Sequence, residues 1–351
     1  TAPAGLTFNA NGTYSFNPAN AAYQSLGVNQ QTVITVPYTV TDNAGATSTA
    51  NLVITVTGTN DAPVAVANTG TVAEGATLSA TAGTGVLAND TDIDSGDTRT
   101  VSAVSFGATP GTVGTALNGT YGTLTLNVDG SYSYVANRPA AEALITGQSA
   151  VDTFSYTVRD AAGATASTTL SFTIDGANDA PTITGPLSGA VTEDLAPGTT
   201  GGTLVITDAD AGQSSFVAQP GTAGTYGTFA ITAAGVWSYT LNNAAANVQA
   251  LPGGAAPTET FTITTADGTT RTITVTVNGA NDAPVANANT VAATEDTALT
   301  IAPATLLGND TDIDSGTTLT ITSVQGAVNG SVALVGGNVV FTPAANYNGP
   351  A

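Results

Sequence analysis

The sequence predicts an all-β protein built of tandem antiparallel β-sandwich domains. Three observations support this: apolar residues alternate with polar ones over many short stretches, Asn-Gly and Asp-Gly pairs separate these stretches, and one six-residue string recurs. The string G-[T/A]-N-D-A-P begins at Gly58, Gly176 and Gly279, with spacings of 118 and 103 residues. Single domains often have such lengths, and self-similarity at a fixed period is typical of repeat architectures.

The recurring string divides the chain into four parts. We expect a C-terminal part-repeat at residues 1–60, full repeats at 61–178 and 179–281, and an N-terminal part-repeat at 282–351. The chain begins at Thr1 without a signal-peptide pattern, so we expect the secretion and anchoring signals to lie outside it.

Strands are predicted where apolar residues alternate with Thr or Ser, as over residues 34–41, 154–158 and 273–277. One apolar face and one Thr-rich face are typical of antiparallel strands that are covered on one side. Pro37 lies inside the first pattern and indicates an edge strand, because proline cannot donate a ladder hydrogen bond.

Turn residues agree with this reading. Asn11-Gly12 and Asp129-Gly130 each join two apolar-alternating stretches, and such pairs supply the positive φ that tight hairpins need. Seven or so short strands per repeat fit a sandwich, roughly as in other domains of about 100 residues. Helical periodicity is almost absent, and single helical turns are expected at Tyr23–Gly27 and Val248–Gly253.

Composition excludes several classes of protein. The chain has 351 residues, 25 Asp and Glu, four Arg and no Lys, His or Cys, and its net charge is −21. Such acidity argues against nucleic acid and against anionic membrane surfaces as partners. Without Cys and His there are no disulfides, thiolate metal sites or histidine bases. No apolar run approaches the roughly 20 residues of a membrane span, whereas an apolar share of 42% allows a folded core.

Most acidic residues keep a fixed phase relative to the recurring string. They form four groups: linker aspartates, glutamates 13 or 14 residues later, aspartate clusters that begin 28 or 29 residues after the linker, and late-turn aspartates. Acids that served only solubility would not keep this phase. The candidate metal-ligating residues are Asp61, Glu74, Asp90, Asp92, Asp94, Asp160, Asp179, Glu193, Asp208, Asp210, Asp267, Asp282, Glu295, Asp310 and Asp312.

Calcium is the ion that this pattern favours. Aspartates at alternate positions repel one another, and the four arginines cannot neutralise them. Oxygen-only ligands suit a hard ion, and Ca²⁺ accepts six to eight oxygens in flexible geometry. An EF-hand is excluded, because the sixth and twelfth positions counted from Asp90 are Ser95 and Val101 instead of Gly and Glu. Since sandwich loops gather at the two ends of a domain, we expect the calcium ions between domains.

These motifs resemble a known family. Asn-Asp-Ala-Pro after a Thr-Val-Thr strand, the Asp-x-Asp pair and the late Asp-x-x-Gly turn resemble the calcium linkers of cadherins. The chain is more similar still to the VCBS and cadherin-like tandem repeats of bacterial type I-secreted RTX adhesins. Residues 179–281 match best, with T-E-D at 192–194, D-A-D at 208–210, G-T-Y-G-T-F at 224–229 and W-S-Y-T-L-N-N at 237–243.

The resemblance implies Ig-like sandwiches that bind calcium, of cadherin-like type at residues 61–178 and VCBS type at 179–281. By analogy, each junction takes ligands from its linker, aspartate cluster and late turn, with the glutamate of the preceding domain. The implied sets are Asp61, Asp90, Asp92 and Asp160 at one junction, Asp179, Asp208, Asp210 and Asp267 at the next, and Glu74 and Glu193 from preceding domains. Glu74 is followed by Gly75 where the family has Asp, so the number of ions per junction stays open.

We therefore expect a calcium-stiffened extender, or spacer, of a large bacterial cell-surface adhesin that serves adhesion or biofilm formation. It would be extracellular, would not be an enzyme, and would have calcium ions and neighbouring repeats as partners. The alternative is a subunit of an extracellular filament or matrix, whose repeats would bind other copies of the chain. A carbohydrate-active module is a weaker hypothesis, because its carboxylate pairs would recur in every repeat and Trp237 lies in a core-like pattern.

Overall fold

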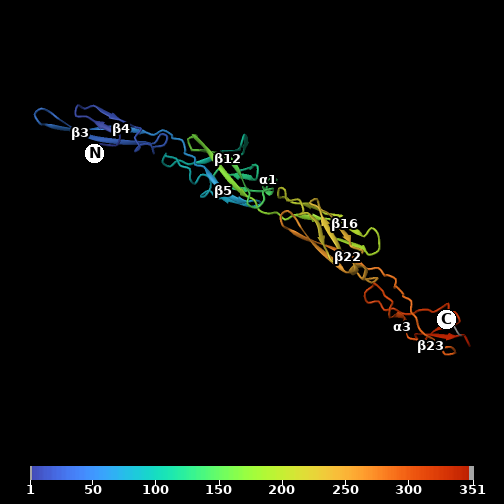
Figure 1. The fold of residues 1–351 in the computed structure, drawn as a ribbon. Coiled ribbons are helices and arrows are strands. Elements are labelled where there is room, and N and C mark those ends of the chain that lie inside the picture. Colours follow the sequence, from blue (N-terminus) through green and yellow to red (C-terminus); the bar gives the residue numbers. More distant parts are fainter. Residues whose placement is uncertain (1, 348–351) are drawn as a thin grey trace. The chain divides into compact units, whose positions relative to one another are not determined.

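The computed structural model describes residues 2–347 and is drawn in Figure 1. These residues fold into two compact units. The first unit holds residues 1–179 together with 209–211, and the second holds 180–208 together with 212–351. Strands dominate, and the helices among the described residues have only four or five residues each. None of those helices has the length and apolar character that a membrane span requires. The prediction of an all-β fold is confirmed.

In the first unit, residues 61–178 form a two-layer sandwich. Its elements are β5 Asn68–Ala73, β6 Thr77–Ala80, β7 Thr100–Phe106, β8 Thr109–Gly111, β9 Ala116–Asn118, β10 Thr123–Leu126, β11 Tyr132–Val135, α1 Pro139–Glu142, β12 Ser149–Arg159 and β13 Thr165–Asp175. One sheet has the order β5-β13-β12-β7-β8, and the other has the order β6-β11-β10-β9. Neighbouring strands are antiparallel except β5 and β13, which run parallel.

The core of this sandwich follows the alternation in the sequence. Phe154, Tyr156 and Val158 occupy alternate positions of β12, and each is at most 1% exposed. Phe172 of β13 stacks on Tyr134 of β11 in the opposite sheet, with 4.0 Å between ring centroids. Apolar burial stabilises a fold by roughly 25 cal/mol per Å², so these rings are a main source of the attraction between the sheets.

Residues 2–60 of the first unit form two hairpins. Their strands are β1 Leu6–Phe8, β2 Tyr14–Phe16, β3 Gln31–Thr41 and β4 Thr47–Thr57. Gly12 has φ of +82° in the β1–β2 turn, as the Asn-Gly pair predicts. Pro37 lies in β3, which pairs with β4 along eleven residues and has no second neighbour among the described residues, so it is an edge strand as predicted.

In the second unit, residues 180–208 and 212–281 form a similar sandwich. Its elements are β14 Thr182–Thr184, β15 Ser188–Thr192, β16 Thr199–Thr203, β17 Val205–Thr207, β18 Gln219–Ala223, β19 Gly227–Ile231, β20 Val236–Leu241, α2 Ala246–Gln249, β21 Thr258–Thr264 and β22 Thr270–Asn278. The sheets have the orders β16-β20-β19-β18, β15-β22-β21 and β14-β17. Trp237 is 1% exposed and donates its indole N–H to the Pro186 carbonyl at 3.0 Å, so it is a core residue.

Residues 282–347 complete the second unit with β23 Leu299–Ile301, α3 Pro303–Leu307, β24 Gly330–Val335 and β25 Asn338–Pro343, in the sheet order β23-β25-β24. The predicted helical turn at Val248–Gly253 begins earlier, since α2 starts at Ala246. The helical turn predicted at Tyr23–Gly27 is not formed, since residues 23–25 lie in turns and residues 26–27 have no regular structure.

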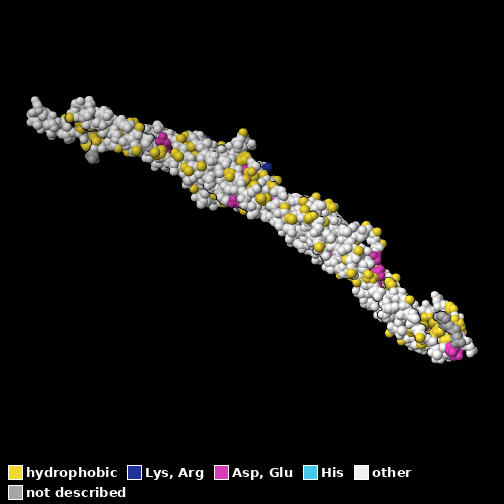
Figure 2. Space-filling model, in the orientation of Figure 1, with side chains coloured by type: hydrophobic (Ala, Val, Ile, Leu, Met, Phe, Trp, Pro, Cys, Tyr) yellow, Lys and Arg dark blue, Asp and Glu magenta, His cyan; other side chains and the backbone are white. Residues whose placement is uncertain are grey.

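Carboxylates are placed unusually in this fold. Figure 2 shows one face, on which Asp and Glu side chains form a few small, separate patches. Several acids of the described residues are instead at most 7% exposed, namely Asp90, Asp94, Asp152, Asp160, Glu193, Asp210, Glu259 and Asp314. A buried charge is costly unless it is hydrogen-bonded, paired or bound to a metal. The partners of these eight carboxylates therefore indicate what the chain does.

Candidate metal centre

The linker aspartates are held in the same way three times. The backbone N–H of Asp61 donates to Asp94 Oδ2, that of Asp179 to Asp210 Oδ2, and that of Asp282 to Asp314 Oδ2, each at 2.9 Å. In each linker the preceding asparagine also donates its side-chain amide to the aspartate carbonyl, at 2.8 to 2.9 Å. The last aspartate of each cluster therefore anchors the linker.

Local turns place the aspartate clusters. Asp94 N–H donates to Asp92 Oδ1, and Asp314 N–H donates to Asp312 Oδ1, both at 2.9 Å. Such bonds let a short aspartate side chain fold its own backbone into a turn. The D-x-D spacing thus shapes the loop as well as supplying oxygens.

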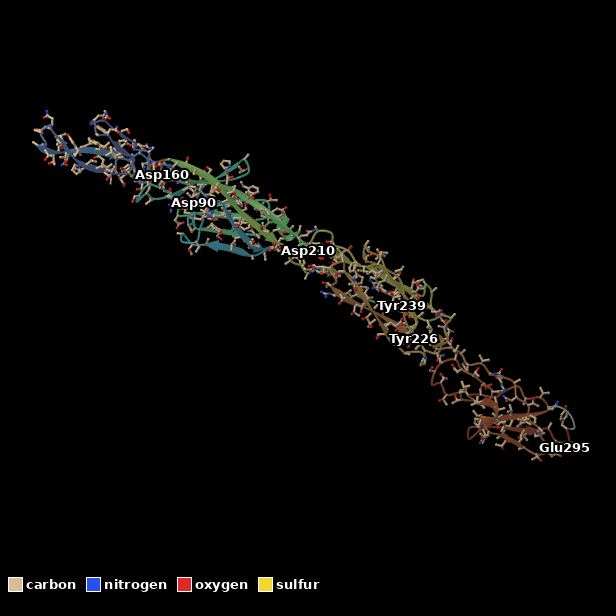
Figure 3. The ribbon with its side chains drawn as sticks, turned by 60° about the vertical axis from the view of Figure 1, so that its left-hand side comes forward. Asp90, Asp160, Asp210, Tyr226, Tyr239 and Glu295 are labelled. Atoms are coloured by element: carbon tan, nitrogen blue, oxygen red, sulfur yellow. The ribbon has the colours of Figure 1, made fainter. Side chains whose placement is uncertain are left out.

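One acidic group in the first unit joins Asp92, Asp97 and Asp160, each of which places a carboxylate oxygen within 4.8 Å of the others. Burial alone raises the pKa of Asp160, but hydrogen bonds from Asn60 at 2.8 Å and from the backbone of Gly163 outweigh it and lower the pKa. Asp160 therefore stays charged beside two further carboxylates. Figure 3 shows Asp160 and Asp90 in this unit.

A second acidic group in the same unit joins Glu74, Asp179 and Asp210, again with oxygens within 4.8 Å of one another. Burial raises the pKa of Glu74, a backbone hydrogen bond from Ala177 lowers it, and the charges of Asp179 and Asp210 raise it further. Glu74 Oε2 and Asp179 Oδ2 are buried and accept no hydrogen bond from the described residues. These two oxygens therefore lie beside other carboxylates of the same group and have no hydrogen-bond donor among the described residues. Asp210 is labelled in Figure 3.

The equivalent residues in the second unit are Glu193, Asp282 and Asp314. Glu193 Oε1 accepts the N–H of Ala280 at 2.7 Å. Its Oε2, Asp282 Oδ2 and Asp314 Oδ1 are buried and accept no hydrogen bond from residues 2–347. Burial raises the pKa of Glu193, and the charges of Asp282, Asp194 and Asp314 raise it further.

Other predicted ligands lie elsewhere. Asp90 Oδ1 accepts the N–H of Val66, and Asp310 Oδ1 accepts that of Asn287, both at 2.7 Å. These two carboxylates therefore tie down the backbone that follows each linker. Asp61 contacts its cluster through its backbone N–H, which donates to Asp94 Oδ2. Asp312 contacts its cluster through its Oδ1, which accepts the N–H of Asp314.

Three more predicted ligands are not in either acidic group. Asp267 accepts hydrogen bonds from Thr265 and Thr269 in its own turn. Asp208 donates its backbone N–H to Ser214 Oγ at 3.0 Å. Glu295 is exposed (Figure 3).

Asp97 and Asp314 were not among the predicted ligands. Asp314 is the counterpart of Asp94, so the repeat phase was sufficient to find it. Asp97 has no counterpart, because the cluster at Asp310–Asp314 is followed by Thr317 at the matching position. Its role depends on the fold, which brings the late turn of Asp160 beside it.

The donor set fits a hard divalent cation. Every ligand atom in these groups is a carboxylate oxygen, and several are buried without a donor. Ca²⁺ binds such oxygens in flexible geometry, and a buried carboxylate group without a cation is destabilising. The chain offers no His or Cys for a softer metal.

Two models of known protein families match the chain. A model described as "Bacterial cadherin-like domain" matches residues 60–176 and 178–279, and one described as "Cadherin-like domain" matches 280–351. The chain belongs to the bacterial cadherin-like domain family. Cadherin-like domains are structural and adhesion modules. The repeat boundaries drawn from the sequence, at residues 61, 179 and 282, stay a prediction.

Solved structures similar to this cadherin-like chain are cadherin ectodomains. "PcdhgB3 EC1-4" is 14% identical with a TM-score of 0.40, and the match covers 99% of this chain and 82% of that structure's chain. Human CDH23 EC21-23 is 19% identical with a TM-score of 0.43, and the match covers 78% of this chain and 81% of the CDH23 chain. Drosophila N-cadherin EC1-4 is 14% identical with a TM-score of 0.30, and the match covers 79% of this chain and 65% of the N-cadherin chain. No curated protein matches the chain.

Proposed function

We propose that the chain is a calcium-stiffened extender region of a bacterial cell-surface adhesin, in which each ion holds the linker between successive cadherin-like repeats. The observation that supports this most is convergence: Glu74, Asp179 and Asp210 approach within 4.8 Å, and Glu74 Oε2 and Asp179 Oδ2 are buried without a donor. Membership of a family whose cadherin relatives bind Ca²⁺ at linkers supports the same reading. The finer proposals are an extracellular location, a VCBS-type repeat, type I secretion and a role in adhesion or biofilm formation.

The proposed ligands come in three sets, with repeat boundaries near residues 61, 179 and 282. They are Asp92, Asp97 and Asp160 for the first linker and Glu74, Asp179 and Asp210 for the second. Repeat phase and the mutual repulsion of the carboxylates add Glu193, Asp282 and Asp314 for the third. A bound Ca²⁺ would neutralise the mutual repulsion of these carboxylates. The chain itself supplies the anchors, because the last aspartate of each cluster accepts the backbone N–H of the linker aspartate.

Calorimetric titration tests this proposal. Asp210→Asn keeps the size of the side chain and removes one charged ligand, so we expect it to abolish or weaken one binding event by at least about tenfold, or 1.4 kcal/mol. Asp129→Asn is the matched control, since Asp129 lies in an exposed hairpin turn where Asn-Gly is equally suitable. Unchanged calcium binding in Asp210→Asn, or equal loss in both variants, contradicts the ligand assignment.

A self-associating filament is the second candidate. The observation that favours it is the two-stranded β3–β4 sheet, on which Val33, Val40 and Val53 are 57 to 61% exposed. Apolar residues on an open strand edge promote pairing with another chain. Light scattering in millimolar calcium separates the candidates: a persistent monomer supports the extender, and concentration-dependent polymers support the filament.

A further inference from the structure

Two buried acids lie outside the linkers and already have full sets of donors. Asp152 of β12 is 0% exposed. Its Oδ1 accepts the N–H of Thr120 at 2.9 Å, and its Oδ2 accepts the N–H of Tyr121 and Gly122 at 3.0 Å and the O–H of Tyr134 at 2.7 Å. Because these donors satisfy the carboxylate, it needs no metal.

Glu259 of β21 repeats this arrangement in the second unit. Its Oε1 accepts the N–H of Thr225 and, at 3.0 Å, the N–H of Tyr226, while its Oε2 accepts the O–H of Tyr239 at 2.5 Å. Figure 3 shows Tyr226 and Tyr239 in the same sandwich. We call each set, Asp152 with 120–122 and Tyr134, or Glu259 with 225–226 and Tyr239, a carboxylate latch.

The latch explains the G-T-Y-G string that both repeats carry. A Cβ on Gly119 would lie 2.2 Å from Asp152 Oδ2, and one on Gly224 would lie 2.5 Å from Glu259 Oε1. Glycine is therefore required for the backbone to approach the carboxylate closely. In each repeat the acid is on one sheet, and the tyrosine and the loop belong to the other, so the latch joins the two sheets.

A chain of backbone hydrogen bonds connects the first latch to the next aspartate cluster. The carbonyl of Tyr121 accepts the N–H of Arg138 at 3.2 Å, where α1 begins. Directly after α1, the carbonyl of Ala143 accepts the N–H of Ala211 at 3.2 Å. Ala211 follows Asp210, which anchors the linker. The latched loop thus supports the helical turn on which the Asp210 loop docks.

The second latch has the same connection. The carbonyl of Tyr226 accepts the N–H of Asn242 at 2.9 Å, and the carbonyl of Thr225 accepts the side-chain amide of Asn247 at 2.8 Å. Directly after α2, the carbonyl of Ala250 accepts the N–H of Ser315 at 3.0 Å. Ser315 follows Asp314, the anchor of the third linker.

Residues 2–60 provide an internal comparison. They align without gaps to the stretch 118 residues later, and Ile34 and Phe16 stand where the latch has Asp152 and Tyr134. The acid and its tyrosine are thus both replaced by apolar residues, and Pro3, which has no N–H, stands where the latch has the donor Tyr121. Such a joint replacement is nearly neutral for a fold when no polar group is left unpaired. The docking bond itself persists, since the Ser25 carbonyl accepts the N–H of Ser95 at 3.0 Å.

We propose that Asp152 and Glu259 are positioning residues, which hold the G-T-Y-G loop and through it the helical turn that receives the aspartate loop of the next repeat. They act on the docking geometry of the Asp210 and Asp314 loops and bind no ion themselves. This proposal does not rest on calcium, and it is tested in the presence of chelator, so its failure is distinguishable from failure of the proposed function.

Amide hydrogen exchange on the full chain tests the proposal. In Asp152→Asn we expect exchange of the Ala211 amide to accelerate at least about tenfold, while the Ser95 and Ser315 amides keep their rates. In Glu259→Gln we expect the acceleration at Ser315 alone, so each variant is the control for the other. Unchanged exchange at Ala211, or equal acceleration at Ser95 and Ala211, overturns the proposal, because the second result indicates general loosening of the repeat.

A double variant keeps the proposal testable if Asp152→Asn does not fold. Asp152→Ile combined with Tyr134→Phe introduces the apolar pair that residues 2–60 use at these positions. We expect this protein to fold, as judged by circular dichroism. We also expect its Ala211 amide to exchange at least about tenfold faster than in the wild type, with the Ser95 amide unchanged, because the N–H groups of the G-T-Y-G loop still lose their acceptor. A folded double variant with wild-type exchange at Ala211 refutes a positioning role.

Discussion

Replacing Glu74 by glutamine gives a prediction whose sign depends on calcium. Gln keeps the carbonyl oxygen that accepts the backbone hydrogen bond from Ala177, but it removes the charge that faces Asp179 and Asp210. We therefore expect Glu74→Gln to stabilise the calcium-free protein and to weaken calcium binding. A residue with only a packing role would not produce these two effects together.

The magnitude follows from the geometry of the acidic group. Its oxygens lie within 4.8 Å of one another, where two unit charges interact by about 3.5 kcal/mol at an effective dielectric constant of about 20. Glu74 keeps part of its surface in water and salt screens exposed charges, so we expect a gain of about 1 to 2 kcal/mol without calcium. At calcium 100-fold above Kd the wild type gains about 2.7 kcal/mol, whereas tenfold weaker binding leaves about 1.4 kcal/mol.

Urea denaturation with chelator and with calcium measures both quantities. Asp129→Asn again serves as the control for the loss of one charge, because its carboxylate is exposed and distant from the acidic groups in sequence. Two results refute the reasoning: a Glu74→Gln protein that is less stable than the wild type in chelator, or one that gains as much free energy of unfolding from calcium as the wild type does.

Three further predictions follow. Burial and neighbouring acids raise the pKa of Glu193 from 4.5. In chelator, its stabilising contribution is therefore present below pH 4.5 and is lost as pH rises through the raised pKa. Glu193→Gln should become more stable than the wild type towards pH 7, and equal profiles of unfolding free energy against pH contradict this. Asp90→Ala removes the acceptor of the Val66 N–H and should cost about 1 to 2 kcal/mol in urea titrations without changing calorimetric calcium binding; a lost binding event would make Asp90 a ligand. Leu170→Ala, at a residue that is 0% exposed, should cost about 2 to 5 kcal/mol of unfolding free energy, and a cost below about 1 kcal/mol would place Leu170 outside a packed core.

The fold was largely predictable because its determinants are local. Strict alternation along Phe154, Tyr156 and Val158 specifies which face of β12 is buried, since strand side chains point alternately to the two faces. Gly12 and Gly130 adopt the positive φ that their hairpin turns require. The pairing of β5 with β13 is parallel and joins residues about 100 positions apart, so no local sequence pattern predicts it.

The candidate site was only partly predictable. Repeat phase selected Glu74, Asp179 and Asp210, which the fold brings together. Phase alone does not separate an oxygen that accepts backbone hydrogen bonds, as in Asp90, from one that lacks a donor. The distinction depends on where loops from distant parts of a repeat meet.

The latch acids illustrate a different limit. Asp152 and Glu259 lie eight residues before the late-turn aspartates Asp160 and Asp267. They nevertheless differ in type, and their neighbours in the strands are Val151 and Thr153, and Thr258 and Thr260. Their role becomes evident only when the G-T-Y-G loop is seen around each carboxylate. A buried acid inside a strand pattern is nevertheless a signal, because such a residue needs dedicated donors.

The most direct test of a metal at the linkers is anomalous diffraction from crystals grown in millimolar calcium. We predict a peak about 2.3 to 2.6 Å from carboxylate oxygens, the distance range of Ca²⁺ coordination, with Glu74, Asp179 and Asp210 as its ligands. Water-like density without anomalous signal at that position, with the three carboxylates turned away from one another, would contradict the proposal.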